Sequence, residues 1–277
     1  MPTNREAYFK AIKLNVPQTV VYFALQEIDG YNYLQLTEHF DDEIKDNVFF
    51  ESAINRYLNG EMIEYIFNKA MFLSKPFYVD KNVLIPRQET EQLVLETKKQ
   101  IDELFGDKQI SIADVCTGSG AIGLSLKSML PNNQHFLTDI SKEAMRVCKT
   151  NAEKLSLNQN VTFLLGDMLK PLIDKAIKVD VVVCNPPYIE DETTIDERTF
   201  NQEPHLALIA KPNTQYYEEV FKNANVVLNE KYLLAFEIGE DMEDKLSTLV
   251  EKYFPYCEYF FMKDIYGKTR FLFIKHQ

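Results

Sequence analysis

The stretch ISIADVCTGSGAIG, from Ile110 to Gly123, decides the fold of this 277-residue chain. Its first six residues are rich in apolar and β-branched side chains and predict a strand. Gly118, Gly120 and Gly123 follow the spacing G-x-G-x-x-G, in which glycines let the backbone turn tightly and approach a ligand. The run GAIGLSLKSML continues from this loop and predicts a helix that Pro131 stops. A strand, a glycine loop and a helix in this order indicate the first unit of a ligand-binding α/β sheet.

Strands and helices alternate over the rest of the chain. QHFLTD, VTFLL, VDVVVC and YLLAFEI predict four further strands, and CEYFFM and TRFLFI contain two more. Helices are predicted over KEAMRVCKTNAEKL and over residues 215–228. The alternation predicts the α/β class, with a doubly wound, mostly parallel sheet of seven strands.

The first 60 residues predict helices instead. Pro17 can open one helix that Gly30 ends. Asp41 and Asp42 are expected to cap another, which carries Phe49 into the core.

A change of character follows these helices. EYIFNKAMFL and PFYV flank Ser74 and Lys75 and predict a β-hairpin, and NVLIP leads into a helix that ends near Gly106. We therefore expect a helical N-terminal domain over residues 1–63, a β-hairpin linker over 64–86 and an α/β domain over 87–277.

Acids end the second and third strands of the predicted sheet. Asp139 lies 21 residues after Gly118, where a carboxylate can bind ribose hydroxyls, and Asp167 follows the next strand. The glycine loop suits two ligands: a dinucleotide places its pyrophosphate at the helix N-terminus, whereas S-adenosylmethionine has no phosphate and can place its amino-acid end there. Asp114, just before the loop, would repel a pyrophosphate and can help to hold an ammonium group, which favours S-adenosylmethionine.

The segment VDVVVCNPPYIED, from Val179 to Asp191, places an unusual tetrapeptide after a buried strand. Pro186 and Pro187 have no N–H to give to a ladder, so the strand must end at Asn185. Proline also restricts the residue before it, so the unit is stiff. It holds one amide and the ring of Tyr188 at the carboxyl end of a strand, where open α/β sheets bind ligands.

Composition narrows the function classes. The net charge of −12 argues against a protein that binds nucleic acid through phosphate neutralisation. The four cysteines and four histidines show no metal-ligand spacing, so we expect no metal. No uncharged apolar stretch approaches membrane-spanning length, and we expect a cytoplasmic protein with no membrane association.

The chain resembles S-adenosylmethionine-dependent methyltransferases with an Asn-Pro-Pro-Tyr signature, and among them the release-factor glutamine methyltransferases. The resemblance covers nearly the whole chain. Its motifs are NVLIPRQETEQLV, DVCTGSGAIGLSL, LTDISKEAMRVCKTNA, VTFLLGDM, VVVCNPPYI, NQEPHLAL, FEIGEDM and DIYGKTRFL. The Ile-Pro-Arg-x-Glu-Thr-Glu segment is the most specific of these. Three places depart from the family. Cys116 stands where glycine is usual, Met168 where an aromatic residue is common, and Ala210-Lys211-Pro212-Asn213 where a glycine-rich segment is expected.

The resemblance implies a Rossmann-like methyltransferase sheet and methylation of the side-chain amide nitrogen of the glutamine in the Gly-Gly-Gln motif of peptide chain release factors. The protein would act as a monomer on this protein substrate, recognise it with the N-terminal domain and bind no nucleic acid directly. The cofactor S-adenosyl-L-methionine, converted to S-adenosyl-L-homocysteine, would be held by Cys116, Thr117, Gly118, Ser119, Gly120, Asp139, Asp167, Met168 and Asn185. Asn185, Pro186, Pro187 and Tyr188 would hold the substrate, and Asn185, Pro186 and Tyr188 would serve catalysis.

Three alternatives remain open at this point. One is the sister class that methylates a glutamine of a ribosomal protein. Another is an adenine-N6 DNA methyltransferase, because the amino group of adenine is also planar and conjugated. The third is a non-enzymatic adaptor that keeps the cofactor fold, against which the intact loop, acids and tetrapeptide argue.

Overall fold

The computed structural model describes residues 1–277, which divide into two compact units. The smaller unit comprises Met1–Lys69 together with Glu197–Gln202, and the larger comprises Ala70–Asp196 and Glu203–Gln277. The expected division at residues 63 and 86 differs from this one. The hairpin belongs to the larger unit because Phe72 and Phe77 are fully buried in the same core cluster as Leu93 and Val94.

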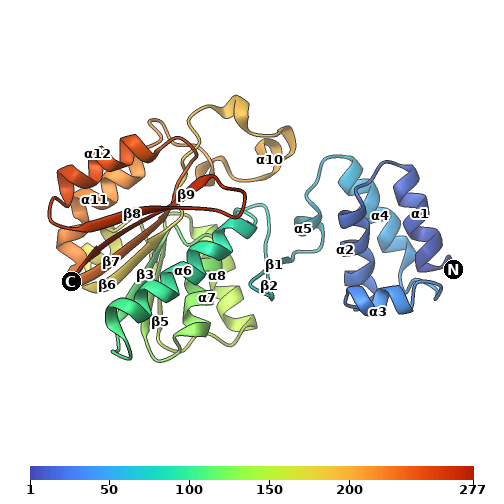
Figure 1. Cartoon of the computed structure of the whole chain (residues 1–277). Helices are drawn as coiled ribbons and strands as arrows, with labels where there is room; N and C mark the ends of the chain where they lie inside the picture. Colours follow the sequence, from blue (N-terminus) through green and yellow to red (C-terminus); the bar gives the residue numbers. More distant parts are fainter. The chain divides into compact units, whose positions relative to one another are not determined.

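The smaller unit is helical (Figure 1). Its helices are α1 (Asn4–Lys13), α2 (Gln18–Asp29), α3 (Tyr33–Glu38), α4 (Asn47–Leu58), α5 (Ile63–Ile66) and α10 (Glu197–Gln202). The prediction for α2 is confirmed, since it begins after Pro17 and ends at Gly30, whose left-handed backbone is easy for glycine.

The prediction for α4 is wrong in its start and in the placement of Phe49. Asp46 caps the helix, and its side chain accepts a hydrogen bond from the backbone N–H of Phe49 at 2.9 Å. The inner face of the helix is formed by Phe50, Ala53 and Ile54. Phe50 is buried, whereas Phe49 is 38% exposed.

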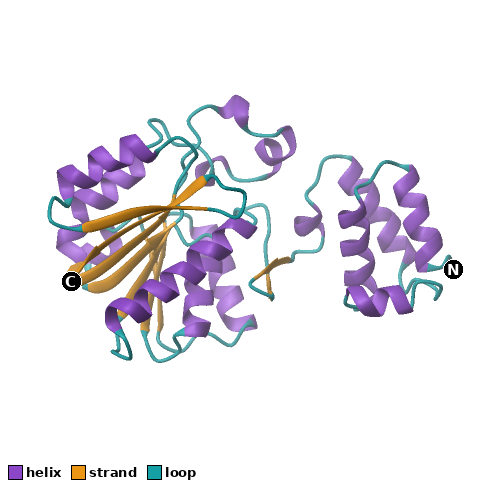
Figure 2. Ribbon diagram, viewed as in Figure 1, coloured by secondary structure: helices purple, strands orange, loops and turns teal.

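The larger unit is built on one seven-stranded sheet between helices (Figure 2). Its strands are β3 (Ser111–Val115), β4 (Gln134–Asp139), β5 (Val161–Leu165), β6 (Val179–Cys184), β7 (Leu228–Glu237), β8 (Glu258–Lys263) and β9 (Thr269–His276), and the separate hairpin has β1 (Ala70–Phe72) and β2 (Lys75–Phe77). Its helices are α6 (Gln88–Phe105), α7 (Ala121–Met129), α8 (Lys142–Lys154), α9 (Lys170–Asp174), α11 (Gln215–Val227) and α12 (Glu243–Tyr253), with 3-10 helices η1 (Glu192–Thr194) and η2 (His205–Ala207).

The strand order β5-β4-β3-β6-β7-β9-β8 confirms a doubly wound, mostly parallel sheet. Neighbouring strands pair in parallel from β5 through β4, β3 and β6 to β7, and β9 pairs antiparallel with both β7 and β8. The chain winds outward in one direction from β3 and in the other from β6. Val115 is in register with Cys184 at the carboxyl ends of these two strands. This is the topological switch point at which open α/β sheets bind ligands.

Both faces of the sheet are covered, which explains the continuous apolar runs in its central strands. Successive residues of β6 alternate between two core clusters: Val181 and Val183 pack with α6, α7 and α8, whereas Val182 and Cys184 pack with α9, α11 and α12. Burial on both faces fixes the register of the strands and therefore the position of the loops that follow them. No helix combines the length and the apolar composition that crossing a lipid bilayer requires.

Candidate active site

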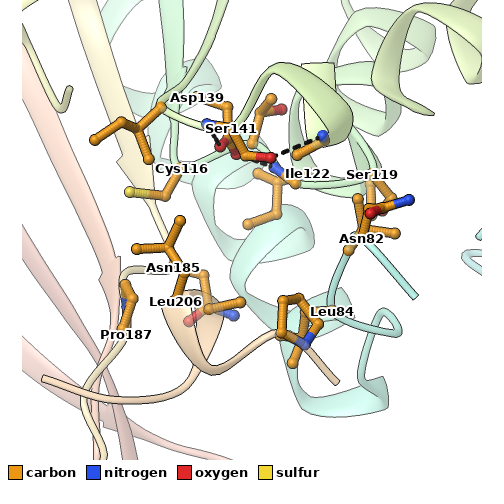
Figure 3. A pocket seen from close by; sticks show the side chains of 18 of the residues that line it. Asn82, Leu84, Cys116, Ser119, Ile122, Asp139, Ser141, Asn185, Pro187 and Leu206 are labelled. Carbon is orange, nitrogen blue, oxygen red and sulfur yellow. Dashed lines mark hydrogen bonds between the residues drawn. The ribbon is translucent and has the colours of Figure 1, made fainter. Parts of the chain in front are cut away.

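A cavity opens at the carboxyl ends of β3 and β6, entirely within the larger unit (Figure 3). Cys116 and Ser119 reach it from the loop after β3, Asp139 from the end of β4, and Asn185 and Pro187 from the loop after β6. The segment before α6 and the segment around η2 complete the lining, represented in Figure 3 by Leu84 and Leu206.

The three glycines of the G-x-G-x-x-G motif after β3 serve different purposes. Gly118 has φ +54° and open space where a Cβ would lie, so its backbone borders the cavity without a side chain. At Gly120 a Cβ would come within 2.8 Å of the Cys148 sulfur, and at Gly123 within 2.7 Å of the Asp114 carboxylate. Gly118 therefore leaves room for a ligand, whereas the other two allow close packing of α7.

Asp139 lines the cavity at the end of β4, as predicted, and also organises the loops around it. One carboxylate oxygen accepts from the backbone N–H of Gly118 and the other from that of Ser141, both at 2.8 Å. Burial raises the pKa of this carboxyl group, opposed by these backbone donors. Each oxygen keeps acceptor capacity for a hydroxyl group in the cavity.

Asp114 does not line the cavity, so the role expected for it in holding an ammonium is not supported. The side chain is buried beneath the glycine loop, where one oxygen accepts from the Thr117 hydroxyl and from the backbone N–H of Gly123. Its other oxygen has no hydrogen-bond partner, and burial raises the pKa of the carboxyl group to about 7. Asp114 holds the loop to the helix and does not contact the ligand space.

The end of β5 contributes Asp167 and Met168 to the lining. The Met168 sulfur lies 3.5 Å from that of Cys116, so two sulfur-containing side chains form one wall. Cys116 has φ +60°, in the left-handed region that glycine adopts most easily. This backbone conformation explains why glycine is usual at the position in the family that the sequence resembles.

The tetrapeptide after β6 is divided between the cavity and the core. Asn185 and Pro187 line the cavity, whereas Pro186 is buried and Tyr188 lies outside the lining. The Tyr188 ring lies against Gly239, and its hydroxyl donates to Glu237 at 3.2 Å. Gly120, also predicted as a cofactor residue, likewise lies outside the lining.

Sequence reasoning missed residues of the segment before α6. Asn82, Val83, Leu84 and Pro86 line the cavity. Arg87, which the sequence did single out as a possible cleft residue, also lines it and forms an ion pair with Glu203 at 2.5 Å. The segment is anchored from a distance, because Asn151 on α8 donates to the backbone carbonyls of both Tyr78 and Ser119. Only the unusual Ile-Pro-Arg-x-Glu-Thr-Glu motif signalled a function here.

Other missed residues follow β4. Ile140 and Ser141 line the cavity directly after Asp139, and Ile140 is 52% exposed. An exposed apolar side chain in a cavity wall is a surface for a flat, apolar part of a ligand.

The class of protein follows from the match to a family model. Residues 94–232 match the model described as the methyltransferase small domain, which covers half of the chain. Solved methyltransferases share the fold. One is a methyltransferase from Pyrococcus furiosus, with a TM-score of 0.52 at 16% identity over 73% of this chain and 89% of that one. Another is the T. thermophilus 16S rRNA N2 G1207 methyltransferase, solved with AdoMet and guanosine, with a TM-score of 0.56 at 15% identity over 76% of this chain and 50% of that one.

Curated relatives then identify the family. The Bacillus anthracis release factor glutamine methyltransferase is 36% identical over 81% of this chain and 80% of its own length. The protein of the same name from Staphylococcus aureus is 34% identical over 93% of this chain and 92% of its own length. That from Clostridium acetobutylicum is 39% identical over 76% of this chain and 74% of its own length. The chain belongs to the release factor glutamine methyltransferase family, which confirms the resemblance seen in its motifs.

Proposed function

We propose that this enzyme transfers a methyl group from S-adenosylmethionine to the side-chain amide nitrogen of the glutamine in the Gly-Gly-Gln motif of peptide chain release factors. One observation carries the proposal: a rigid Asn-Pro-Pro-Tyr unit ends β6 beside a cavity built by the glycine loop and Asp139, at the switch point of the sheet. Membership of the family supports the choice of substrate.

The cavity lining fits S-adenosylmethionine better than a dinucleotide. Asp139 and Asp167 supply carboxylates, and the only Lys or Arg of the lining is Arg87, which is paired with Glu203. A pyrophosphate would meet two acids and no free cation, whereas a ligand that carries sulfonium and ammonium charges suits them. Asp139 would accept from the ribose hydroxyls, Ile140 and Met168 would contact the adenine, and the backbone around Gly118 would face the methionine end. When bound, S-adenosylmethionine supplies an electrophilic methyl group.

The residues after β6 suit a planar amide as the acceptor of that methyl group. An amide nitrogen is a poor nucleophile because its lone pair is delocalised. Two hydrogen-bond acceptors, the Asn185 side-chain oxygen and the Pro186 carbonyl, can bind both N–H groups of a glutamine side chain. They would orient the nitrogen toward the methyl group and stabilise the positive charge that develops on it. Pro186 and Pro187 stiffen the backbone that carries these acceptors because their φ angles are fixed.

The proposal is tested with purified release factor and labelled S-adenosylmethionine, followed by mass spectrometry of the modified residue. We expect label on the side-chain nitrogen of the glutamine, and none in a release factor whose Gly-Gly-Gln motif carries alanine at that position. Label on a ribosomal protein with release factors untouched would favour the sister class. Label on adenine-N6 of DNA would favour the nucleic-acid alternative.

A further inference from the structure

A chain of hydrogen bonds connects Asn185 to a buried carboxylate behind the cavity wall. The Asn185 side-chain nitrogen donates to the Thr90 hydroxyl oxygen at 3.5 Å, and that hydroxyl donates to Glu237 at 2.6 Å. Tyr188 donates to the other oxygen of Glu237 at 3.2 Å. Thr90 lies on α6 and Glu237 ends β7, and both are nearly inaccessible, with exposures of 4% and 3%. Asn185 and Tyr188, at the two ends of the tetrapeptide, are thus tied to one carboxylate.

The direction of these bonds is fixed by the numbers of protons available. An ionised carboxylate only accepts, so the single proton of the Thr90 hydroxyl must go to Glu237. The Thr90 oxygen can then only accept, so Asn185 must present its NH₂ group to it. The Asn185 oxygen is consequently turned to the opposite side of the amide.

We propose that Thr90 and Glu237 are positioning residues that select the amide orientation of Asn185, so that its oxygen and not its nitrogen meets the substrate amide. The proposal rests on the proposed function and deepens it. A reversed Asn185 would present donors to a substrate nitrogen that itself carries two protons, and the acceptor that orients the substrate would be lost. Thr90 and Glu237 can hold the Asn185 amide in this orientation as long as the Glu237 carboxylate stays ionised.

The groups around Glu237 determine the pH range in which its carboxylate stays ionised. Burial raises the pKa of Glu237, and Glu89 on α6 adds to the rise. Arg270 on β9 and the hydrogen bonds from Thr90 and Tyr188 oppose it. Tyr188 stays a donor because burial raises the pKa of its hydroxyl too, and Tyr217 on α11 donates to the Glu237 backbone carbonyl. Methyl transfer should therefore fall as the pH drops through the raised pKa of Glu237, when a protonated carboxyl group can donate and the constraint on Thr90 is lost.

The test uses Thr90→Val, which keeps the shape and removes the hydroxyl. We expect kcat on a release factor to fall by about 10- to 100-fold, the scale of losing an outer partner that orients a functional side chain. KM and the Kd for S-adenosylmethionine should stay within about threefold of the wild type, because valine keeps the shape of Thr90 where that residue lines the cavity. Thr90→Ser should recover most of the activity. In Glu237→Gln the activity should be low and the acid limb of the pH profile absent.

Thr97→Val is the matched control. Thr97 lies two turns further along the same helix, is fully buried, and its hydroxyl has no hydrogen-bond partner. The same substitution there should leave kcat unchanged. If Thr90→Val methylates as fast as Thr97→Val, or loses S-adenosylmethionine affinity in step with activity, the positioning role is wrong.

A second measurement separates this proposal from the proposed function. The side-chain NH₂ resonances of Asn185, assigned by comparison with Asn185→Asp, should shift in Thr90→Val and stay in place in Thr97→Val. Unchanged resonances in Thr90→Val would overturn the network whatever the substrate is. Absence of methyl transfer to release factors by the wild type, with the expected shifts present, would overturn the proposed function alone.

Discussion

Asp139 is the residue on which cofactor binding should depend most directly. We predict that Asp139→Ala weakens S-adenosylmethionine binding by roughly 10- to 150-fold, because losing a hydrogen bond to a charged group costs about 1.5–3 kcal/mol. Calorimetry measures this Kd. The substitution also frees the N–H groups of Gly118 and Ser141 in the loops, which adds to the loss. Unchanged affinity in a folded variant would remove Asp139 from the site, and tight binding of NAD by the wild type would contradict the cofactor assignment.

Asp114 gives a second prediction, on stability against pH. Its folded-state pKa of about 7 lies above the ordinary 3.8, so its contribution to stability is fully present below about pH 4 and is lost as the pH rises through 7. The shift of about three units bounds this contribution at about 4 kcal/mol. We expect Asp114→Asn to flatten the fall in the free energy of unfolding between pH 4 and 8. As a control, Asn in place of the exposed Asp174 (Asp174→Asn) should leave the pH dependence of the free energy of unfolding unchanged. Parallel curves of this free energy against pH for Asp114→Asn and the wild type would contradict the prediction.

At the scale of elements, most of the α/β fold was predictable because local pattern and burial agree. Strand β6 reads as a continuous apolar run because both of its faces are buried. The glycine loop, Asp139, Asp167 and Asn185 were placed by their positions after strands, which parallel topology brings to one edge. The start of α4 was wrong because several acids could serve as its cap, and the one whose side chain accepts from the first turn is Asp46.

The part of the site that was missed depends on contacts distant in sequence. Glu237 could be singled out as a scaffold residue beside the cleft, but Thr90 lies 147 residues away, and nothing in either local segment reveals their hydrogen bond. The same applies to Asn151, whose amide connects the loop of β3 to the segment before α6. The hydrogen bond from the Tyr188 hydroxyl to Glu237 is also distant in sequence, whereas the expectation that the ring faces the substrate stays a prediction.

Helix α7 offers a test of how closely elements must pack at the site. Gly123→Ala would place a Cβ 2.7 Å from the Asp114 carboxylate and 2.9 Å from Leu137. Alanine gains about 1 kcal/mol in helix propensity, whereas overpacking costs about 1–3 kcal/mol, and two hydrogen bonds prevent Asp114 from moving away. We expect net destabilisation in urea unfolding. Ser125→Ala, on the same helix at a buried hydroxyl without a partner, should be neutral or stabilising. A Gly123→Ala variant more stable than the wild type would contradict this packing account.

At the scale of the whole molecule, the net charge of −12 limits the substrates. We predict that duplex DNA is not methylated and that any binding to it is weak and lost by physiological salt, because affinity for nucleic acid depends on cations that neutralise phosphates. Titrations at several salt concentrations, with methyl-transfer assays on DNA and release factor side by side, measure both. Comparable rates on adenine and on the protein would contradict this. The monomeric state and the cytoplasmic location stay predictions.

The central claim is that Asn185 orients a substrate amide beside bound cofactor, and single-turnover methyl transfer by Asn185→Ala on a purified release factor tests it most directly. We predict a loss on the order of 10² or more in the transfer rate, the scale of deleting one preorganised group from a transition-state site. S-adenosylmethionine should still bind appreciably, since Asp139 and the glycine loop are intact. Transfer at nearly the wild-type rate would mean that the tetrapeptide after β6 is only a turn, and would contradict the account.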